Sequence, residues 1–364
     1  MRIVITADPD LPVPPKLYGG IERIIDLLIS GLKSRGHTVA LVAHPDSTSC
    51  VDAFFPWPGR QAQKKLDTLQ NTRALWSAVQ KFRPDVLHSF SRIAYLTPFI
   101  SASLPKVMSY QREPNRRTTY WATKLAGSSL SFTGCSDYIC RKGQVSGGQW
   151  HTIHNCVVLD KFAFQPQVAS DAPLVFLSRL ERIKGVHMAI AVARKTGRRL
   201  IIAGNRVSSV EGEAYWQREI APYIGRDGIE YVGSVDDVQK NKLLGEAAAM
   251  IVPIEWNEPF GIVFAESLAC GTPVVSCPTG ALPEIVREGI DGFLVEDFES
   301  ACRAVENLGQ INRYDCRERA VSQFSSEVIV RQYETLYRSL VPPTKPHIAM
   351  HTAGNHQLTP EGTP

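Results

Sequence analysis

The chain has 364 residues, 44% of them hydrophobic and 21% charged, which is the composition of a soluble globular protein long enough for two domains. It carries 40 basic and 36 acidic side chains, a balance that argues against a dedicated nucleic-acid binder. No apolar run approaches the roughly 18 residues of a membrane-spanning helix, and the short apolar start predicts a buried strand rather than a signal peptide.

Short β-prone runs alternate with helical patterns over residues 1–168. Apolar side chains at helical spacing predict an amphipathic helix over Gly20–Arg35, between strands at Arg2–Ala7 and Thr38–Ala43. Further strands are predicted at Val86–Ser89, Lys106–Ser109, Leu130–Thr133 and Trp150–His154. This alternation is typical of a parallel sheet with helices on both faces.

The same pattern starts afresh after Phe164–Pro173, with a helix predicted over Val186–Lys195. Strands are predicted at Leu174–Leu177, Leu200–Ala203, Ile229–Val232, Met250–Pro253 and Pro273–Ser276. We therefore expect two doubly wound α/β domains, 1–168 and 169–340, with a ligand cleft between them at the carboxyl ends of the strands. The last helix, Ser326–Leu340, is expected to pack back towards the first domain, and residues 341–364 to form a disordered tail.

The segment after the strand Met250–Pro253 is the richest in chemical groups. A helix predicted to begin near Gly261 would expose backbone donors to an anion. These donors are the N–H groups of Gly261, Ile262 and Val263. Glu258 precedes this helix and Glu266 lies more than a turn inside it, so the two carboxylates should contact an elongated ligand at different depths. The alternative is that Glu258 caps the helix and Glu266 is a solvated surface charge.

The loop Ser178–Gly185 follows the first strand of the second domain. Arg179 offers a planar guanidinium and Lys184 a mobile point charge, which together suit a diphosphate. Alone, such a loop is usually a solvated turn, but the nearby anion-accepting helix start favours phosphate binding.

Two candidates lie in the first domain. Gly19 and Gly20, within Tyr18–Glu22, would let a ligand approach the backbone at a helix start, although the alternative is a simple turn. They form no dinucleotide fingerprint. His88, at the end of a strand, is a catalytic candidate whose alternative is a structural role.

No metal site is predicted. Asp8 and Asp10 lie in a proline-rich loop without further ligands, and Asp236-Asp237 resembles a helix N-cap. The eight cysteines contain no Cys-x-x-Cys pair, so they predict buried thiols in a reducing cytoplasm.

These motifs resemble the retaining, two-Rossmann-domain (GT-B) glycosyltransferases of family 4, of the bacterial, glycogen synthase-like type. The hallmark of that family is two glutamates with seven residues between them, which Glu258 and Glu266 match. The match continues through Gly280–Val286, Gly289–Val295 and, at the domain junction, Asn155–Phe162. The resemblance covers about residues 1–340.

The resemblance implies a nucleoside diphosphate sugar as donor and no other cofactor. Glu266 would bind the ribose hydroxyls, Glu258 the transferred sugar, and Arg179 with Lys184 the diphosphate. Groups flanking the donor would come from Gly19, Gly20, Phe260, Gly261, Ile262 and Val263. The chain departs from the family at Gln111, where a histidine is frequent, and at Ser178 and Cys156, where glycine is usual.

The resemblance predicts metal-independent, retaining transfer of a sugar to a hydroxyl acceptor, in the synthesis of a bacterial glycan, glycolipid or glycosylated metabolite. The alternatives are a sugar-nucleotide epimerase or hydrolase on the same fold, and a non-catalytic sugar-nucleotide-binding subunit. The basic stretch Gln111–Arg117, with Lys124 and Arg141-Lys142, is either an ordinary solvated loop or an attractor for an anionic or membrane-associated acceptor. The expected location is therefore the cytoplasm, free or at the inner face of the membrane.

Overall fold

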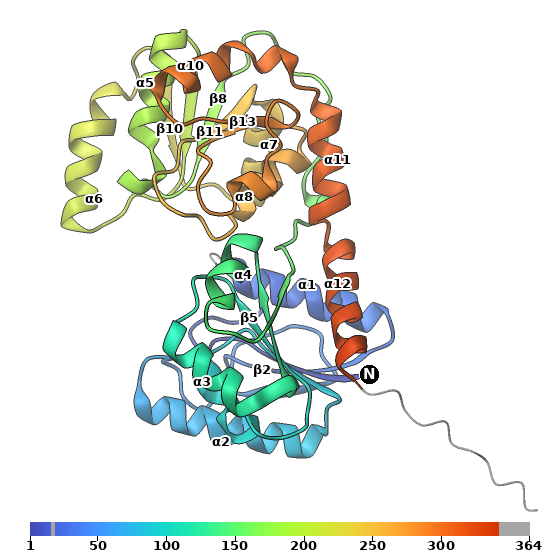
Figure 1. Cartoon of the computed structure of the whole chain (residues 1–364). Coiled ribbons are helices and arrows are strands. Elements are labelled where there is room, and N and C mark those ends of the chain that lie inside the picture. The colour runs from blue at the N-terminus through green and yellow to red at the C-terminus, as the bar shows by residue number, and fades with distance from the viewer. Residues whose placement is uncertain (16–18, 342–364) are drawn as a thin grey trace, which may run out of the picture.

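The computed structural model describes residues 1–15 and 19–341 and contains two parallel sheets, one in each half of the molecule (Figure 1). The first sheet has the strand order β3-β2-β1-β4-β5-β6-β7 and the second the order β10-β9-β8-β11-β12-β13. Every neighbouring pair in both sheets is parallel. The strand order reverses beside β1 in the first sheet and beside β8 in the second, and ligands of such sheets bind at these reversals. The predicted fold of two doubly wound domains is confirmed.

The first domain is built from seven strands and the helices between them. The strands are β1 Arg2–Thr6, β2 Thr38–Ala43, β3 Ala53–Pro56, β4 Val86–Ser89, β5 Lys106–Tyr110, β6 Leu130–Gly134 and β7 Gln149–Thr152. The α-helices are α1 Gly20–Ser34, α2 Lys65–Phe82, α3 Arg116–Ala126 and α4 Asp137–Gln144. Its apolar core divides into two clusters, one containing the buried side of α1 and the other that of α2 and α3.

The second domain repeats the arrangement around one large apolar core. Its strands are β8 Leu174–Leu177, β9 Leu200–Ala203, β10 Ile229–Gly233, β11 Ala249–Val252, β12 Val274–Ser276 and β13 Gly292–Leu294. Its helices are α5 Val186–Thr196, α6 Val210–Tyr215, α7 Asp237–Glu246, α8 Ile262–Ala269, α9 Leu282–Ile285, α10 Phe298–Glu306 and α11 Arg313–Phe324. The patterning did not predict β3 and β13. Both are short edge strands, and β3 alternates between half-buried and exposed residues instead of forming a continuous apolar run.

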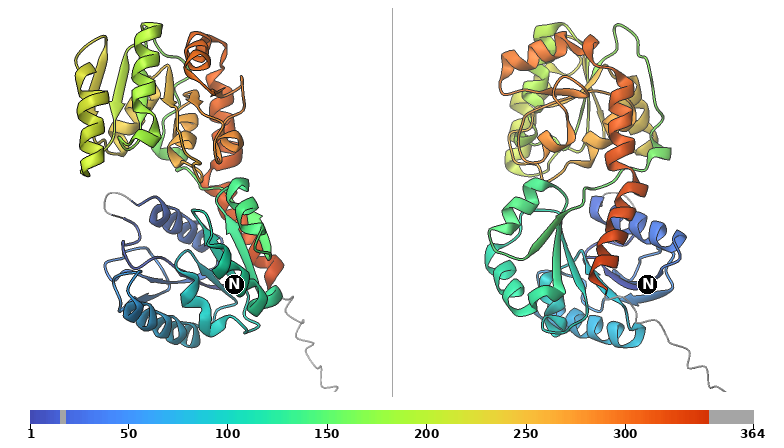
Figure 2. Two further views of the ribbon diagram at one scale, coloured as in Figure 1. Left: turned by 60° about the vertical axis from the view of Figure 1, so that its left-hand side comes forward. Right: turned by 45° about the vertical axis from the view of Figure 1, so that its right-hand side comes forward.

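The last helix, α12 (Ser326–Leu340), crosses from the second domain to the first and lies beside α1 (Figures 1 and 2). Its buried side joins the core that contains α1. The two helices pack tightly at Gly31, where a Cβ would lie 2.5 Å from the side chain of Val330. Glu334 of α12 adds a 3.0 Å contact to His37 of the first domain. The predicted tail beyond residue 341 lies outside the described residues, as does Tyr18.

Candidate functional site

A cleft of about 600 Å³ is lined by loops from both domains. The first domain contributes Leu11, Gly19, Gly20, Ile21, Glu22, Gln111, Arg112 and Asn155. The second contributes Leu177, Ser178, Arg179, Lys184, Val252, Ile254, Trp256 and residues 258–264. Most of these residues follow β1, β5, β8 and β11, so the cleft lies at the carboxyl edges of both sheets, where open α/β sheets bind ligands.

Lys184 and Glu258 form an ion pair in this cleft. Lys184 Nζ lies 2.6 Å from Glu258 Oε2, and only 8% and 15% of the two side chains are exposed. Trp256 Nε1 donates a second hydrogen bond to the same oxygen at 3.2 Å, and its ring lies 5.0 Å from the ammonium. Gly185 has φ 75°, and a Cβ there would lie 2.0 Å from the carbonyl oxygen of Pro253. Because Gly185 has no side chain, the loop Ser178–Gly185 can pack against the end of β11, which brings Lys184 to Glu258.

Helix α8 begins directly beside this ion pair. Its N-cap residue, Gly261, has φ 78° and no side chain with which to bond the first N–H groups of the helix. A Cβ at Gly261 would lie 3.1 Å from Cγ of Glu258, so the carboxylate lies against the helix start without capping it. The N–H groups of Ile262 and Val263 are thus placed to meet an anion.

The loop at residues 279–281 packs against the backbone that carries Glu258. The Ala281 N–H donates to the Glu258 carbonyl at 2.9 Å, and the Thr279 hydroxyl donates to the Trp256 carbonyl at 3.0 Å. Gly280 has φ 58°, and a Cβ there would lie 2.3 Å from the Glu258 carbonyl oxygen. The motif beginning at Gly280 therefore shapes the backbone that carries Glu258.

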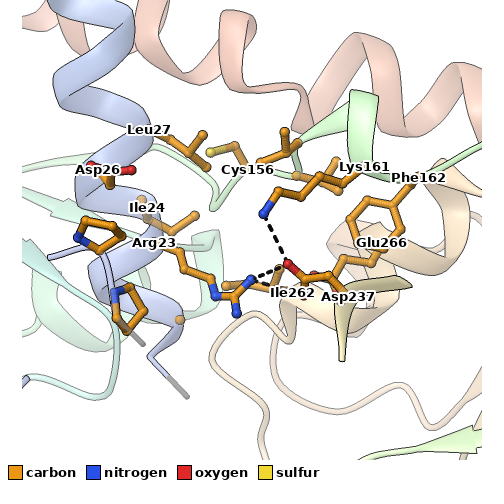
Figure 3. Close-up of a pocket in the computed structure, with 15 residues that line it drawn as sticks. Arg23, Ile24, Asp26, Leu27, Cys156, Lys161, Phe162, Asp237, Ile262 and Glu266 are labelled. Carbon is orange, nitrogen blue, oxygen red and sulfur yellow. Dashed lines mark hydrogen bonds and ion pairs between the residues drawn. The ribbon is translucent and has the colours of Figure 1, made fainter. Parts of the chain in front are cut away.

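Glu266 lines a second pocket, of about 300 Å³ (Figure 3). Gly20 and Ile262 line both this pocket and the cleft, so the two lie next to each other. Glu266 Oε1 accepts from Lys240 Nζ at 2.7 Å, and 14% of the Glu266 side chain is exposed. The two carboxylates thus lie in neighbouring cavities, Glu258 in the cleft and Glu266 in the second pocket. No capping role is seen for Glu258, and Glu266 is not a free surface charge.

An ion-pair cluster borders the Glu266 pocket and joins the two domains. Asp237 of α7 accepts from Arg23 of α1 at 2.8 Å and from Lys161 at 3.1 Å (Figure 3). Burial alone would raise the pKa of Asp237, but the hydrogen bonds from these two cations lower it to about 2. Asp236 is the N-cap of α7, as the sequence predicted.

Arg179 lines the cleft with half of its side chain exposed, and its Nη1 lies 2.9 Å from Glu181 Oε1. Gln111 and Arg112 line the same cleft from the first domain. The structure thus brings Gly19, Gly20 and every predicted site residue of the second domain except Glu266 into one cleft, with Glu266 in the adjoining pocket.

His88 is the exception, because the structure does not bring it to the cleft. It is fully buried, and its ring nitrogens contact the Tyr337 hydroxyl at 2.5 Å and the Ser109 hydroxyl at 2.7 Å. Burial lowers the pKa of His88 to about 3. Within β4, His88 shares its side with Val86, which belongs to the core covered by α1 and α12. His88 therefore ties the sheet to the last helix, and its assignment as a catalytic residue is corrected.

Helix α4 of the first domain is docked on the second domain by two residues that the sequence analysis gave no role. Glu284 accepts from the N–H groups of Asp137 and Tyr138, at 2.6 and 2.7 Å, which are the first two of the helix. Ser136, the N-cap of α4, donates its hydroxyl to the Pro259 carbonyl at 2.6 Å. Since Pro259 follows Glu258 directly, this contact links domain docking to the position of the cleft carboxylate. The available sequence signal was the Pro-Glu pair within Gly280–Val286.

On the first-domain side, Asp8 lies just beyond β1. Its Oδ1 is buried without a hydrogen-bond partner among the residues that the structure describes. Burial, followed by the charge of Asp10, raises the pKa of Asp8 to about 6, while Arg112 opposes this rise. Near the cleft wall there is thus a carboxyl group that changes its charge close to neutral pH.

Residues 1–15 and 19–341 contain no group of three or more His, Cys, Asp or Glu side chains arranged to hold a metal ion. Over the same residues, no helix is both long and apolar enough to cross a membrane.

Comparison with known proteins identifies the family. A family model described as glycosyl transferases group 1 matches residues 160–320, and that of glycosyltransferase family 4 matches residues 18–161. Glycogen synthase of Mycobacterium tuberculosis is 24% identical, over 89% of this chain and 92% of its own length. The chain belongs to the family-4 glycosyltransferases.

Other known proteins are similar to shorter or longer parts of this family-4 glycosyltransferase. N-acetyl-alpha-D-glucosaminyl L-malate synthase of Bacillus anthracis is 32% identical over 131 residues, which span only 33% of this chain and 32% of that protein. HepE of Anabaena, solved in complex with UDP-glucose, superposes with a TM-score of 0.69 over 93% of this chain and 100% of its own, at 17% identity. At that identity the superposition shows the shared GT-B fold. The two family models meet at residues 160–161, between the two sheets.

Proposed function

We propose that this protein transfers a sugar from a nucleoside diphosphate sugar to a hydroxyl acceptor with retention at the anomeric carbon. The observation that carries the proposal is the Lys184–Glu258 pair beside the start of α8, in a cleft that lies next to the Glu266 pocket. A sugar, a diphosphate and a nucleoside would occupy these positions in that order. The complex of HepE with UDP-glucose supports a nucleotide sugar as donor.

In this proposal the chemistry is electrostatic. As the bond between the sugar and the diphosphate breaks, negative charge grows on the leaving phosphate. Lys184, Arg179 and the N–H groups of Ile262 and Val263 would stabilise that charge, and preorganised donors of this kind are often the largest contribution to catalysis. Because two side-chain cations are available at the diphosphate position, we propose that the reaction needs no divalent metal.

Glu258 would orient the transferred sugar, and its contact with Lys184 keeps that cation at the helix start. The acceptor would enter past Gln111 and Arg112 on the first-domain wall. The departing phosphate would accept the proton of the acceptor hydroxyl, so that leaving and attack occur on the same face of the sugar. We propose a cytoplasmic location, because all eight cysteines are unpaired thiols.

Product analysis tests the proposal. The protein is incubated with a panel of nucleotide sugars and hydroxyl acceptors, and the anomeric configuration of the product is determined by NMR. Transfer with retention supports the proposal. An isomerised donor would indicate an epimerase, a free sugar that forms equally without acceptor would indicate a hydrolase, and bound but unconverted donor would indicate a non-catalytic subunit.

Two controls sharpen the test. Glu258→Gln should abolish most transfer, whereas Glu255→Gln, three residues earlier and 44% exposed, should transfer like the wild type. A chelator should change the rate little. Activity lost on chelation and restored by a divalent cation would contradict the metal-free proposal.

A further inference from the structure

Helix α3 is amphipathic in an unusual sense, because its large apolar side chains face outwards. The residues turned towards the sheet are small: Thr119, Ala122 and Ala126 are buried. Tyr120, Trp121 and Leu125 are 45%, 55% and 59% exposed. A helix whose only task is to cover a sheet has the opposite distribution, and an exposed apolar cluster of this kind marks an interaction surface.

The same exposed side carries positive charge. Arg116, Arg117 and Lys124 are exposed, and the helix contains no Asp or Glu. Within the described part of the chain, no carboxylate lies within ion-pair distance of these three cations. Lys124 Nζ instead lies 5.7 Å from the ring of Tyr120. This surface combines aromatic rings with cations that have no carboxylate partner among the residues described. It is complementary to a partner whose outer layer is anionic and whose interior is apolar.

Helix α2 also exposes large apolar side chains. Its buried residues and those of α3 belong to the same core cluster, so both helices cover the same face of the sheet. On α2, Leu66, Leu69 and Trp76 are 64%, 49% and 51% exposed. The two helices thus expose two tryptophans, a tyrosine and three leucines.

We propose that the exposed sides of α3 and α2 bind the protein to an anionic lipid bilayer. Tryptophan and tyrosine are enriched where water meets lipid, because one end of each ring is apolar and the other polar. Lysine and arginine beside them are attracted to anionic headgroups. Helices with this combination lie in the plane of the interface without crossing it.

If the proposed function holds, this placement also limits the chemical class of the acceptor. Arg112 lines the cleft and α3 begins at Arg116, so the chain between them spans at most about 14 Å. A bilayer in contact with α3 therefore lies near the acceptor side of the cleft. The acceptor is then a hydroxyl compound anchored in that bilayer by an apolar chain.

Flotation with lipid vesicles tests the surface without requiring catalysis. The full chain is mixed with vesicles of phosphatidylcholine containing one third phosphatidylglycerol, and in parallel with vesicles of phosphatidylcholine alone. We expect binding to the anionic vesicles only, weakening as salt is raised. The triple variant R116Q/R117Q/K124Q should bind about 100-fold more weakly, at about fivefold for each cation. The variant W121Q/L125Q should bind at least 10-fold more weakly, because it loses the inserted apolar side chains.

The matched control is K195Q/R199Q/R303Q, which removes the same charge from exposed positions on the second domain and should bind like the wild type. The proposal is wrong if the wild type does not float with anionic vesicles, or if both α3 variants float as it does. It is also wrong if W121Q/L125Q abolishes a concentration-dependent dimer instead of vesicle binding. Tighter binding of single-stranded RNA, lost in the same variants, would likewise overturn it.

Failure of this inference is distinguishable from failure of the proposed function. Donor binding and transfer to a water-soluble acceptor are measured without vesicles, and both α3 variants should retain them. If the protein transfers sugar in solution but does not bind vesicles, only the proposed membrane surface is wrong. A protein that binds vesicles but never transfers sugar refutes the proposed function alone.

Discussion

Replacing Asp8 by asparagine should stabilise the protein above pH 6 and leave its stability almost unchanged near pH 4. The folded chain holds the pKa of Asp8 at about 6, against 3.8 for an ordinary aspartate. The unfolded chain therefore releases this proton more easily, and ionising Asp8 costs the folded state free energy as the pH rises from about 4 to 6. At 1.36 kcal/mol per pKa unit, the full cost is about 3 kcal/mol. Asparagine has the same shape and no charge, so it removes this cost.

Thermal unfolding of wild type and Asp8→Asn is compared at pH 4 and pH 7.5. If the first domain unfolds as one unit, about 3 kcal/mol corresponds to a rise in Tm of roughly 6 to 12 °C at the higher pH. The pKa of about 6 already includes the opposing attraction of Arg112. Asp171→Asn, an exposed aspartate of the second domain, serves as the control and should show no such pH-dependent gain. An equal effect of Asp8→Asn at both pH values would refute the reasoning.

Three further predictions concern the site. Glu266→Ala should weaken donor binding by about 1.5 to 3 kcal/mol in calorimetry, the range for hydrogen bonds to a charged group; an unchanged dissociation constant would remove Glu266 from the donor site. Arg179→Ala and Lys184→Ala should each lower kcat more than stability, because they act on charge that grows in the transition state. The effect of Lys184→Ala should be the larger, since it also leaves Glu258 without its cation, and the reverse order would contradict the importance of that ion pair. Glu284→Ala, which removes two short charge-assisted hydrogen bonds to α4, should lower both Tm and kcat, whereas Arg141→Ala, which removes only a 3.9 Å contact to the same carboxylate, should change neither.

The features predicted well from the sequence are those that depend on local periodicity. The apolar residues of Ser326–Leu340 repeat at helical spacing, and the helix that they predict has the limits of α12. The central strands are buried on both faces and therefore read as continuous apolar runs. The residues around Glu258 were placed in the cleft because the carboxyl ends of parallel strands meet at one edge.

The features predicted poorly depend on contacts between distant parts of the chain. The sequence placed Lys184 and Glu258 at the same cleft but not in direct contact, since their pairing requires Gly185 to meet the Pro253 carbonyl. His88 was placed at the correct strand end but given the wrong environment. Its partner Tyr337 lies on a helix that joins the first domain only at the end of the sequence.

That last helix limits how the two halves of this protein can be exchanged with those of its relatives. The chain passes from the first domain to the second before β8 and returns with α12, so the first half is made of two separate stretches of sequence and the second half of one. A recombinant that replaces everything after β7 would give α1 a foreign helix in place of Val330 and would leave His88 without Tyr337. A chimera that replaces the second domain therefore needs two junctions, one before β8 and one between α11 and α12. It retains Ser326–Leu340 together with the original first domain. The unit that recombination can transfer is therefore the stretch from β8 to α11, which lies between the two points where the chain passes from one domain to the other.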